Sequence, residues 1–88
     1  MEPTLIKVEE ERLFHRITVR IAYFDEFSLV CALIFACYVI ERAENLEVKL
    51  WDSYVEEQMW NEIFMQNVSF SVLYKDDNAR DNFLKLVS

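Results

Sequence analysis

Few side chains in this sequence could carry out catalysis or hold a metal ion. His15 is the only histidine, and Cys31 and Cys37 are the only cysteines. His15 falls on the apolar face of an alternating segment, where a hydrogen-bonded structural histidine is more common than a general base. One histidine and two cysteines also fall short of the ligand set of a structural zinc site. We therefore predict that the protein is not an enzyme and that it uses no metal or other cofactor.

The two cysteines lie in an apolar run over residues 29–40. Six residues of helix separate them, and the resulting rise of about 9 Å exceeds the Cα separation of about 7 Å that a disulfide allows. They are predicted to be two small buried hydrophobic side chains in a reducing compartment. The run is too short for a membrane span, and Met1, Glu2 and Pro3 do not begin a secretory leader. These features predict a cytoplasmic protein.

The composition excludes several functions. The chain has no glycine, so it lacks the glycine-rich loops that bind phosphates and the strained turn that presents a nucleophilic serine. Sixteen acidic residues against nine basic ones give a formal net charge of −7. This charge opposes direct binding to nucleic acid or to anionic membranes and favours a basic protein as the partner.

The carboxylates gather in three clusters, which we take as the candidate partner-binding residues. Helical turns repeat about every 5.4 Å, a spacing on the scale of the phosphates along a nucleic-acid strand. A rigid array of carboxylates could occupy the DNA-binding surface of a basic protein, provided that neighbouring lysines and arginines do not neutralise it. The alternative is that each cluster is a solvated surface, with acids favoured at helix starts. The clusters are Glu9, Glu10 and Glu11; Asp52, Glu57 and Glu62; and Asp76, Asp77 and Asp81.

Hydropathy periods predict the elements of the first half. Residues 13–24 alternate between apolar and polar side chains, which indicates a half-buried strand. Asp25 can cap the apolar segment 26–43, which is predicted to be a helix. Upstream, the β-prone residues 4–8 are followed by an acidic turn. The segment 1–12 is therefore expected to be either an arm or a hairpin strand.

The second half is predicted to contain two strands and two helices. Residues 45–52 and 68–74 alternate and indicate strands. Ser53 and Glu56 form a capping box, which predicts a helix between the two strands. A last helix, capped by Asp77, is expected to follow the second strand.

The predicted fold is one α+β domain over 1–88, a small two-layer α/β sandwich of three to four strands. Because each strand has an apolar and a polar face, the helices are expected mainly on one face of the sheet. The helix over 26–43 is apolar nearly all round, so other helices or another copy of the protein must cover its second side. The candidate interface consists of three residues. Trp51 is expected on the open sheet face, and Tyr54 and Met65 are expected on the solvent-facing side of the next helix.

Size, charge and the three acidic clusters give the chain a resemblance to a known type of protein. It resembles the very small, acidic, glycine-poor inhibitors by which phages block host DNA-binding proteins, nucleases or transcription factors. The resemblance implies a non-enzymatic DNA mimic, a homodimer that acts in the host cytoplasm during host takeover. The alternative hypothesis is an interaction or assembly module that docks through an apolar surface and whose acidity serves only solubility.

Overall fold

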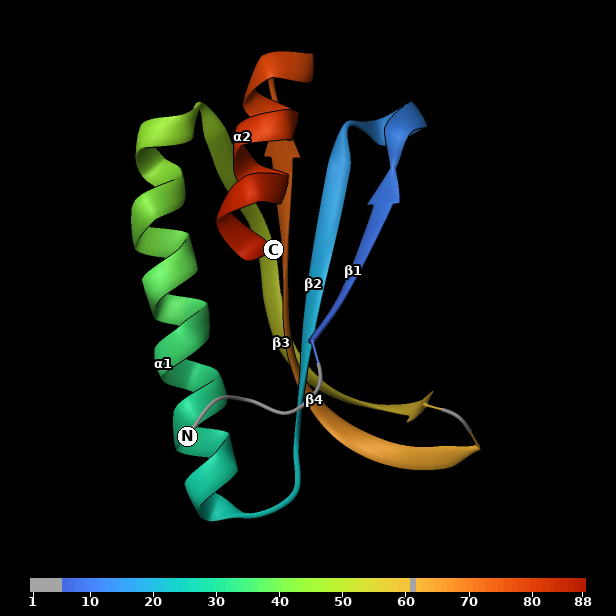
Figure 1. Cartoon of the computed structure of the whole chain (residues 1–88). Coiled ribbons are helices and arrows are strands. Elements are labelled where there is room, and N and C mark those ends of the chain that lie inside the picture. Colours follow the sequence, from blue (N-terminus) through green and yellow to red (C-terminus); the bar gives the residue numbers. More distant parts are fainter. Residues whose placement is uncertain (1–5, 61) are drawn as a thin grey trace.

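The computed structural model describes residues 6–60 and 62–88. Four strands and two helices follow one another in the order ββαββα (Figure 1), which confirms the predicted α+β class. Within the described residues, neither helix is both long and apolar enough to cross a membrane. The elements are β1 (Ile6–Glu11), β2 (Arg16–Tyr23), α1 (Glu26–Ala43), β3 (Val48–Trp60), β4 (Ile63–Tyr74) and α2 (Asp77–Val87).

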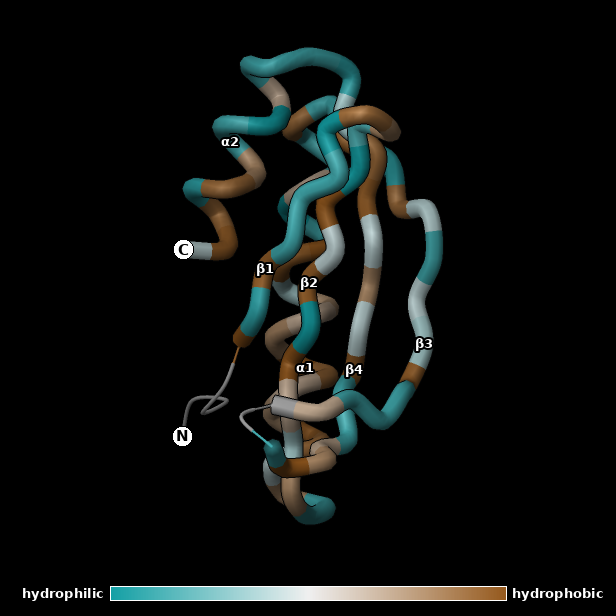
Figure 2. Tube along the Cα trace, turned by 90° about the vertical axis from the view of Figure 1, so that its right-hand side faces the viewer, coloured by the Kyte–Doolittle hydropathy of each residue, from teal (hydrophilic) through white to brown (hydrophobic). Residues whose placement is uncertain are grey.

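The four strands form one antiparallel sheet in the order β1-β2-β4-β3. Figure 2 shows them side by side in this order, with α1 behind them. β2 and β4 are the central strands, and β1 and β3 form the two edges. The register of β3 against β4 shifts between Leu50 and Asp52, where Trp51 stands. The far end of the β3–β4 hairpin curves away from α1 (Figure 1).

The core joins the two central strands to both helices. The apolar side chains of β2 pair in register with those of β4 and therefore share one face of the sheet. Buried side chains of α1 and α2 belong to the same cluster, and their burial is the main favourable contribution to folding. The cluster includes Ile17, Val19 and Ile21; Val68, Phe70 and Val72; Ala32, Ala36, Val39 and Ala43; and Ala79, Phe83 and Val87.

α1 has the limits that the sequence predicts. The Asp25 carboxylate accepts a hydrogen bond of 2.8 Å from the Ser28 N–H, and the Ser28 hydroxyl accepts one of 3.0 Å from the Asp25 N–H. The first of these bonds holds the pKa of Asp25 below its ordinary value. Arg42 lies in the last turn, where a cation interacts favourably with the helix dipole. α2 is capped by Asp76, one residue before the expected Asp77.

The prediction of a helix after Ser53 is wrong, because this segment forms the β3–β4 hairpin. A helix cap is worth about 1 kcal/mol, whereas Val48–Trp60 pairs with β4 along its length. Glu56, the other half of the capping box, instead accepts a hydrogen bond from Arg20 of β2. Long-range strand pairing has therefore overridden a local helix signal. The strand predicted over 45–52 begins only at its fourth residue.

The first hairpin turns later than the sequence predicts. β1 extends through Glu11, so the glutamates expected in the turn belong to the strand, and residues 12–15 make the turn. Of the two alternatives for residues 1–12, an arm or a hairpin strand, β1 confirms the hairpin strand. Residues 1–5 lie outside the described part of the chain. The prediction that His15 lies on the apolar face of a strand is wrong. It is exposed in the turn, and its ring stacks on that of Tyr74 with centroids 5.1 Å apart.

Within residues 6–60 and 62–88, three turn residues have a left-handed backbone. They are His15 in the β1–β2 turn, Glu47 between α1 and β3, and Glu62 in the β3–β4 turn, with φ of 51°, 58° and 69°. Glycine is the usual residue in this conformation, and the chain has none. These three turns are therefore made by residues that carry a Cβ atom.

Candidate functional site

The glutamates of the first acidic cluster bind arginines of the same chain. Glu11 accepts two hydrogen bonds of 2.8 Å from Arg16, which faces it in the β1–β2 register. Glu9 accepts one of 2.8 Å from Arg20. The hydrogen bonding from Arg16 holds the pKa of Glu11 below its ordinary value. These carboxylates are therefore paired with cations between β1 and β2.

Arg20 stands at the centre of a polar network on the sheet. It donates hydrogen bonds of 2.8 Å to Glu56 of β3 and to Glu9 of β1, and only 14% of its side chain is exposed. Next to Arg20 along β2, Thr18 shares a hydrogen bond of 2.8 Å with Ser71 of β4, and both side chains are buried. The polar sheet face that the sequence predicts is present, but its charges pair with one another across the strands.

Glu10 lies on the opposite face of β1 and binds α2. Its carboxylate accepts hydrogen bonds from Arg80 Nε at 2.5 Å and from the Tyr74 hydroxyl at 3.0 Å. The hydrogen bond from Arg80 lowers the pKa of Glu10, although partial burial acts in the opposite direction. Burial, together with the hydrogen bond to Glu10, raises the pKa of Tyr74. Glu10 therefore joins the edge strand β1 to α2 and to the end of β4.

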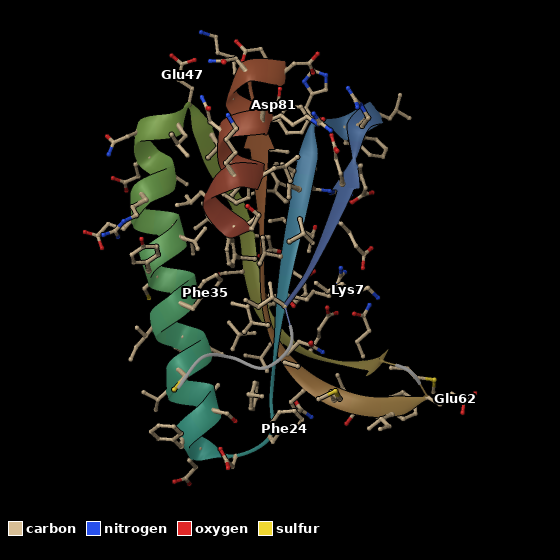
Figure 3. The ribbon with its side chains drawn as sticks, in the orientation of Figure 1. Lys7, Phe24, Phe35, Glu47, Glu62 and Asp81 are labelled. Atoms are coloured by element: carbon tan, nitrogen blue, oxygen red, sulfur yellow. The ribbon has the colours of Figure 1, made fainter. Side chains whose placement is uncertain are left out.

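The second acidic cluster follows the hairpin rather than a helix. Asp52 and Glu57 lie on β3, and Glu62 lies in the turn before β4. Asp52 accepts a hydrogen bond of 2.8 Å from the next backbone N–H, and Glu57 accepts one of 3.4 Å from Gln66. Figure 3 shows Glu62 at the tip of the hairpin, at the other end of the molecule from Asp81. The fold therefore separates Glu62 of this cluster from Asp81 of the third one.

The third acidic cluster lies at the start of α2, as predicted, but it is partly neutralised. Asp76 caps the helix. Asp77 lies 3.8 Å from Arg12, and Asp81 lies 2.6 Å from Arg80. Arginines are thus within ion-pair distance of five of the nine predicted carboxylates, namely Glu9, Glu10, Glu11, Asp77 and Asp81.

The candidate interface residues differ in their exposure. Trp51 is 61% exposed at the irregularity in β3. Tyr54 is half-buried on β3, opposite Ser69 of β4. Met65 was expected on the wet side of a helix, but it lies on β4 with only 8% exposure. The prediction that Tyr54 and Met65 lie on the water-facing side of a helix is therefore wrong, because this helix does not form and both residues lie on strands.

α1 has apolar side chains on both of its sides. Its buried residues are Ala32, Ala36, Val39 and Ala43, and the partly buried Leu29, Phe35 and Ile40 pack against the same core. Ile34, near the middle of the opposite side, is 64% exposed. We call the exposed apolar side of this helix the outer stripe, which consists of Phe27, Val30, Leu33, Ile34, Cys37 and Tyr38.

The sequence predicts that α1 is apolar nearly all round, and this pattern does not indicate which side of the helix faces the sheet. Both cysteines were expected to be buried, yet Cys37 is exposed and Cys31 is half-buried. The signal that marks the buried side is the recurrence of alanine. Ala32, Ala36 and Ala43 recur on one side of the helix, where their small side chains allow close packing against the sheet.

The outer stripe continues into a groove between α1 and β3. Leu33, Cys37 and Ile40 line this groove from α1, and Val55, which is 58% exposed, lines it from β3. A shallow hollow also runs along α1 from Val30 to Arg42. The exposed apolar surface therefore extends from the helix to the edge strand.

Charged residues stand at the two ends of the outer stripe. Residues 27–40 contain no charged side chain. Glu26 lies in the first turn of α1 and Arg42 in the last, with the Arg42 guanidinium 3.6 Å from the centroid of the Tyr38 ring. Neither Glu26 nor Arg42 forms an ion pair with any residue that the structure describes. Glu41, which also lines the hollow along α1, stands next to Arg42. The stripe is thus an apolar surface with an acid at one end and both an acid and a base at the other.

Neither a metal-binding cluster nor a known family points to a function. Within residues 6–60 and 62–88, no three histidine, cysteine or acidic side chains gather in a way that could hold a metal ion. The chain matches no protein-family model, and a search of curated proteins also finds no match. What the protein binds has therefore to be inferred from its own surfaces.

Proposed function

We propose that the protein is a non-enzymatic protein-binding module that docks through the outer stripe of α1. The observation that carries this proposal is that α1 is apolar on both sides. Its alanines, with Leu29, Phe35 and Ile40, pack against the core, and the bulky side chains of the outer stripe face solvent. In a helix that only completes a core, the bulky apolar side chains lie inside. In this proposal both helices cover the same face of the sheet, and the outer side of α1 is left for a partner.

Burial of the outer stripe by a partner would contribute favourably to the free energy of binding. Complete burial of an exposed valine, leucine, isoleucine or phenylalanine side chain is worth about 1.5–3 kcal/mol. The large apolar residues of the stripe are 44–64% exposed, so each contributes about 1 kcal/mol, before the cost of association. The groove toward Val55 enlarges this surface. A protein with a matching apolar ridge is therefore the expected partner.

Mimicry of DNA has less support from the geometry than apolar docking. Mimicry requires carboxylates that are free to meet the lysines and arginines of a partner. Glu9, Glu10 and Glu11 instead bind arginines of their own chain. Glu57 and Glu62 remain exposed, and the net charge of −7 still favours a basic partner. Occupation of a DNA-binding surface therefore stays a prediction, which salt can test.

Affinity capture at two salt concentrations separates the two modes of binding. The wild-type chain and an Ile34→Glu variant are immobilised, and proteins are captured from a cell lysate at low and at moderate salt. Each capture is done with and without duplex DNA as a competitor. We expect the wild-type chain to retain its partner at both salt concentrations and in the presence of DNA, because apolar contacts are hardly screened by salt. Ile34→Glu is expected to lose the partner, because it places a charge in the middle of the stripe.

A charge-reversed variant is the matched control. Glu57→Lys, Glu62→Lys and Asp81→Lys change exposed residues outside the outer stripe, so the far-UV circular dichroism and the capture are both expected to be unchanged. Capture that disappears at the higher salt, is competed by DNA and is lost in this variant would show that carboxylates hold the partner. That result would replace apolar docking with mimicry.

A further inference from the structure

The groove between α1 and β3 lies beside a free strand edge (Figure 2). We infer that the partner docks through an extended segment, which adds to the edge of the sheet at β3 and places apolar side chains in the groove against α1. This inference rests on the proposed docking function, because the groove continues the outer stripe. When a strand is added to a sheet edge, backbone hydrogen bonds provide affinity and alternate side chains provide specificity.

The helices leave one face of β3 uncovered. Ser53 and Val55 pair with Phe70 and Val68 of β4, so their side chains lie on the face of the sheet that carries the core. On a strand that the helices cover, both side chains would be buried, but Ser53 and Val55 are exposed. The groove that they line is therefore accessible from the outer edge of β3.

The outer edge of β3 also has free backbone groups. Among the described residues β3 pairs only with β4, so alternate residues direct their N–H and C=O groups away from the sheet. The Ser53 N–H is directed outward, because its hydrogen bond of 2.8 Å goes to the carboxylate of the neighbouring Asp52. The register is regular from Asp52 onward. Val55 and Glu57 therefore direct their backbone groups outward as well.

This combination of features favours an extended segment over a helix. The backbone groups in the middle of a helix are hydrogen-bonded within the helix, so a helix in the groove could not bond to the strand edge. An extended segment has free N–H and C=O groups at alternate residues and can pair with Ser53, Val55 and Glu57. Its residues opposite Ser53 and Val55 share their face of the sheet, so these side chains enter the groove beside Leu33 and Cys37.

The charge of Glu57 sets the direction of the added segment. Glu57 is exposed on the same face as Val55, and it forms no ion pair with any residue that the structure describes. All strands of the sheet pair antiparallel, which is also the slightly more stable arrangement. An antiparallel segment passes Glu57 first, then Val55 and then Ser53. Its expected sequence is a basic residue, any residue, an apolar residue, any residue and an apolar residue.

Binding of a synthetic peptide to the full chain tests strand addition. The peptide is acetyl-Ser-Lys-Thr-Val-Thr-Leu-Ser-amide, which places lysine opposite Glu57, valine opposite Val55 and leucine opposite Ser53. We expect a dissociation constant of about 100 µM, measured from the shifts of backbone amide signals in NMR spectra. The bound peptide is expected to slow hydrogen exchange of the Val55 and Glu57 amides by about 10-fold or more, because these amides gain hydrogen bonds.

N-methylation of the peptide distinguishes strand addition from general apolar contact. The N–H groups of its lysine, valine and leucine face β3, whereas those of its two threonines face away. N-methylation of the valine is expected to weaken binding by about 10-fold or more, because a hydrogen bond is lost and a donor is blocked. N-methylation of the second threonine is the matched control and is expected to change affinity by less than about 3-fold. Equal losses in the two peptides overturn strand addition.

A variant in the groove tests where the peptide binds. Val55→Lys places a charge in the groove and is expected to weaken the peptide by about 10-fold or more. Because Val55 is exposed, the far-UV circular dichroism of this variant should be unchanged. Ile34→Glu is the matched control, since Ile34 lies outside the lining of the groove, and it should bind the peptide like the wild-type chain. A peptide that Val55→Lys binds equally well overturns the site.

Exchanging charges tests the direction of the segment. A peptide with glutamate in place of lysine is expected to bind Glu57→Lys more tightly than the wild-type chain, and the lysine peptide is expected to show the opposite preference. Each preference should be no more than about 5-fold, because exposed ion pairs are weak, so loss of this contact would not abolish capture of a partner. Glu62→Lys, at the tip of the hairpin, is the control. The same preferences in Glu62→Lys overturn the contact with Glu57.

The remaining outcomes separate this inference from the docking function. A peptide that does not bind at about 1 mM, or that binds without slowing exchange of the Val55 amide, overturns strand addition. Protection of the same amide by dimerisation of the wild-type chain would assign the edge to a second copy. If the peptide fails but capture is lost in Ile34→Glu, the partner docks on the outer stripe without adding a strand. If the peptide binds but Ile34→Glu leaves capture unchanged, the edge binds extended segments and docking through the outer stripe is wrong.

Discussion

α1 and α2 contribute to the same core, but they differ in the side chains that they expose to solvent. α2 buries Phe83 and turns Asp81 and Lys85 toward solvent. α1 buries three alanines and a valine, and it turns Phe27 and Ile34 toward solvent. The usual amphipathic arrangement therefore holds for α2, whereas α1 is apolar on both sides, because Leu29, Phe35 and Ile40 also pack against the core.

This contrast separates residues that stabilise the single chain from residues that we propose to bind a partner. A buried aromatic side chain in α2 stabilises the fold directly, whereas the bulky side chains of the outer stripe gain most of their burial only when another surface covers them. We therefore expect substitutions in the two helices to have different effects. Buried positions should change the free energy of unfolding, and outer-stripe positions should change association.

The largest difference is expected between two phenylalanines. Phe83→Ala should lower the free energy of unfolding by about 3–5 kcal/mol, because Phe83 is 0% exposed. Phe27→Ala should change it by no more than about 0.5 kcal/mol, because Phe27 is 59% exposed. Urea unfolding followed by far-UV circular dichroism, at a concentration low enough to prevent self-association, measures both. Equal losses would contradict the assignment of the two helix faces.

A smaller difference is expected between two neighbouring residues of α1. Ala36→Leu should destabilise the fold by about 1–3 kcal/mol, because Ala36 is 5% exposed in the core cluster. Cys37→Leu should be neutral to within about 0.5 kcal/mol, because Cys37 is exposed. The same unfolding measurement applies. A neutral Ala36→Leu would mean that α1 is not packed closely against the sheet.

The smallest effect concerns the polar contact that anchors α2. The pKa of Glu10 is lowered in the folded chain by its hydrogen bond from Arg80, against an ordinary value of 4.5. Its carboxylate therefore stabilises the fold above that value, and the contribution is lost as the pH falls through the folded-state pKa. Glu10→Gln should lower the free energy of unfolding at pH 7 by about 1 kcal/mol. The difference from the wild-type chain should shrink as the pH falls below 4.5.

The control for this pH dependence is Glu44→Gln. Glu44 is exposed and forms no ion pair among the described residues, so its unfolding curve should follow the wild-type chain at both pH values. A Glu10→Gln variant that differs from the wild-type chain by the same amount at pH 7 and at about pH 3 would mean that Glu10 does not act through its charge.

Elements whose signals are local could be predicted from the sequence. The limits of α1 follow from the Asp25 cap and the apolar run behind it. β2 and the second half of β4 follow from their alternation. The β3–β4 hairpin could not be predicted in this way, because the Ser53 and Glu56 capping box is a local helix signal and the strand pairing that overrides it is long-range.

The site was only partly predictable, because ion pairing depends on register. Glu9, Glu10 and Glu11 are adjacent in sequence, yet two bind arginines of β2 and the third binds Arg80, seventy residues away. The spacing of these residues in the sequence does not indicate that the arginines lie close to the glutamates. The arginine partners of these glutamates therefore could not be predicted from the sequence, and neither could the exposure of the outer stripe of α1.

The residues with left-handed backbone limit the stability of the folded chain. His15, Glu47 and Glu62 each hold a backbone conformation that costs a residue with a Cβ atom roughly 1–2 kcal/mol, so the folded chain stores strain at three corners. Glycine at these corners would release that strain at a smaller entropic cost of about 0.5–1 kcal/mol. All three corners lie outside α1, so a more heat-resistant form could be engineered without altering the surface proposed to bind.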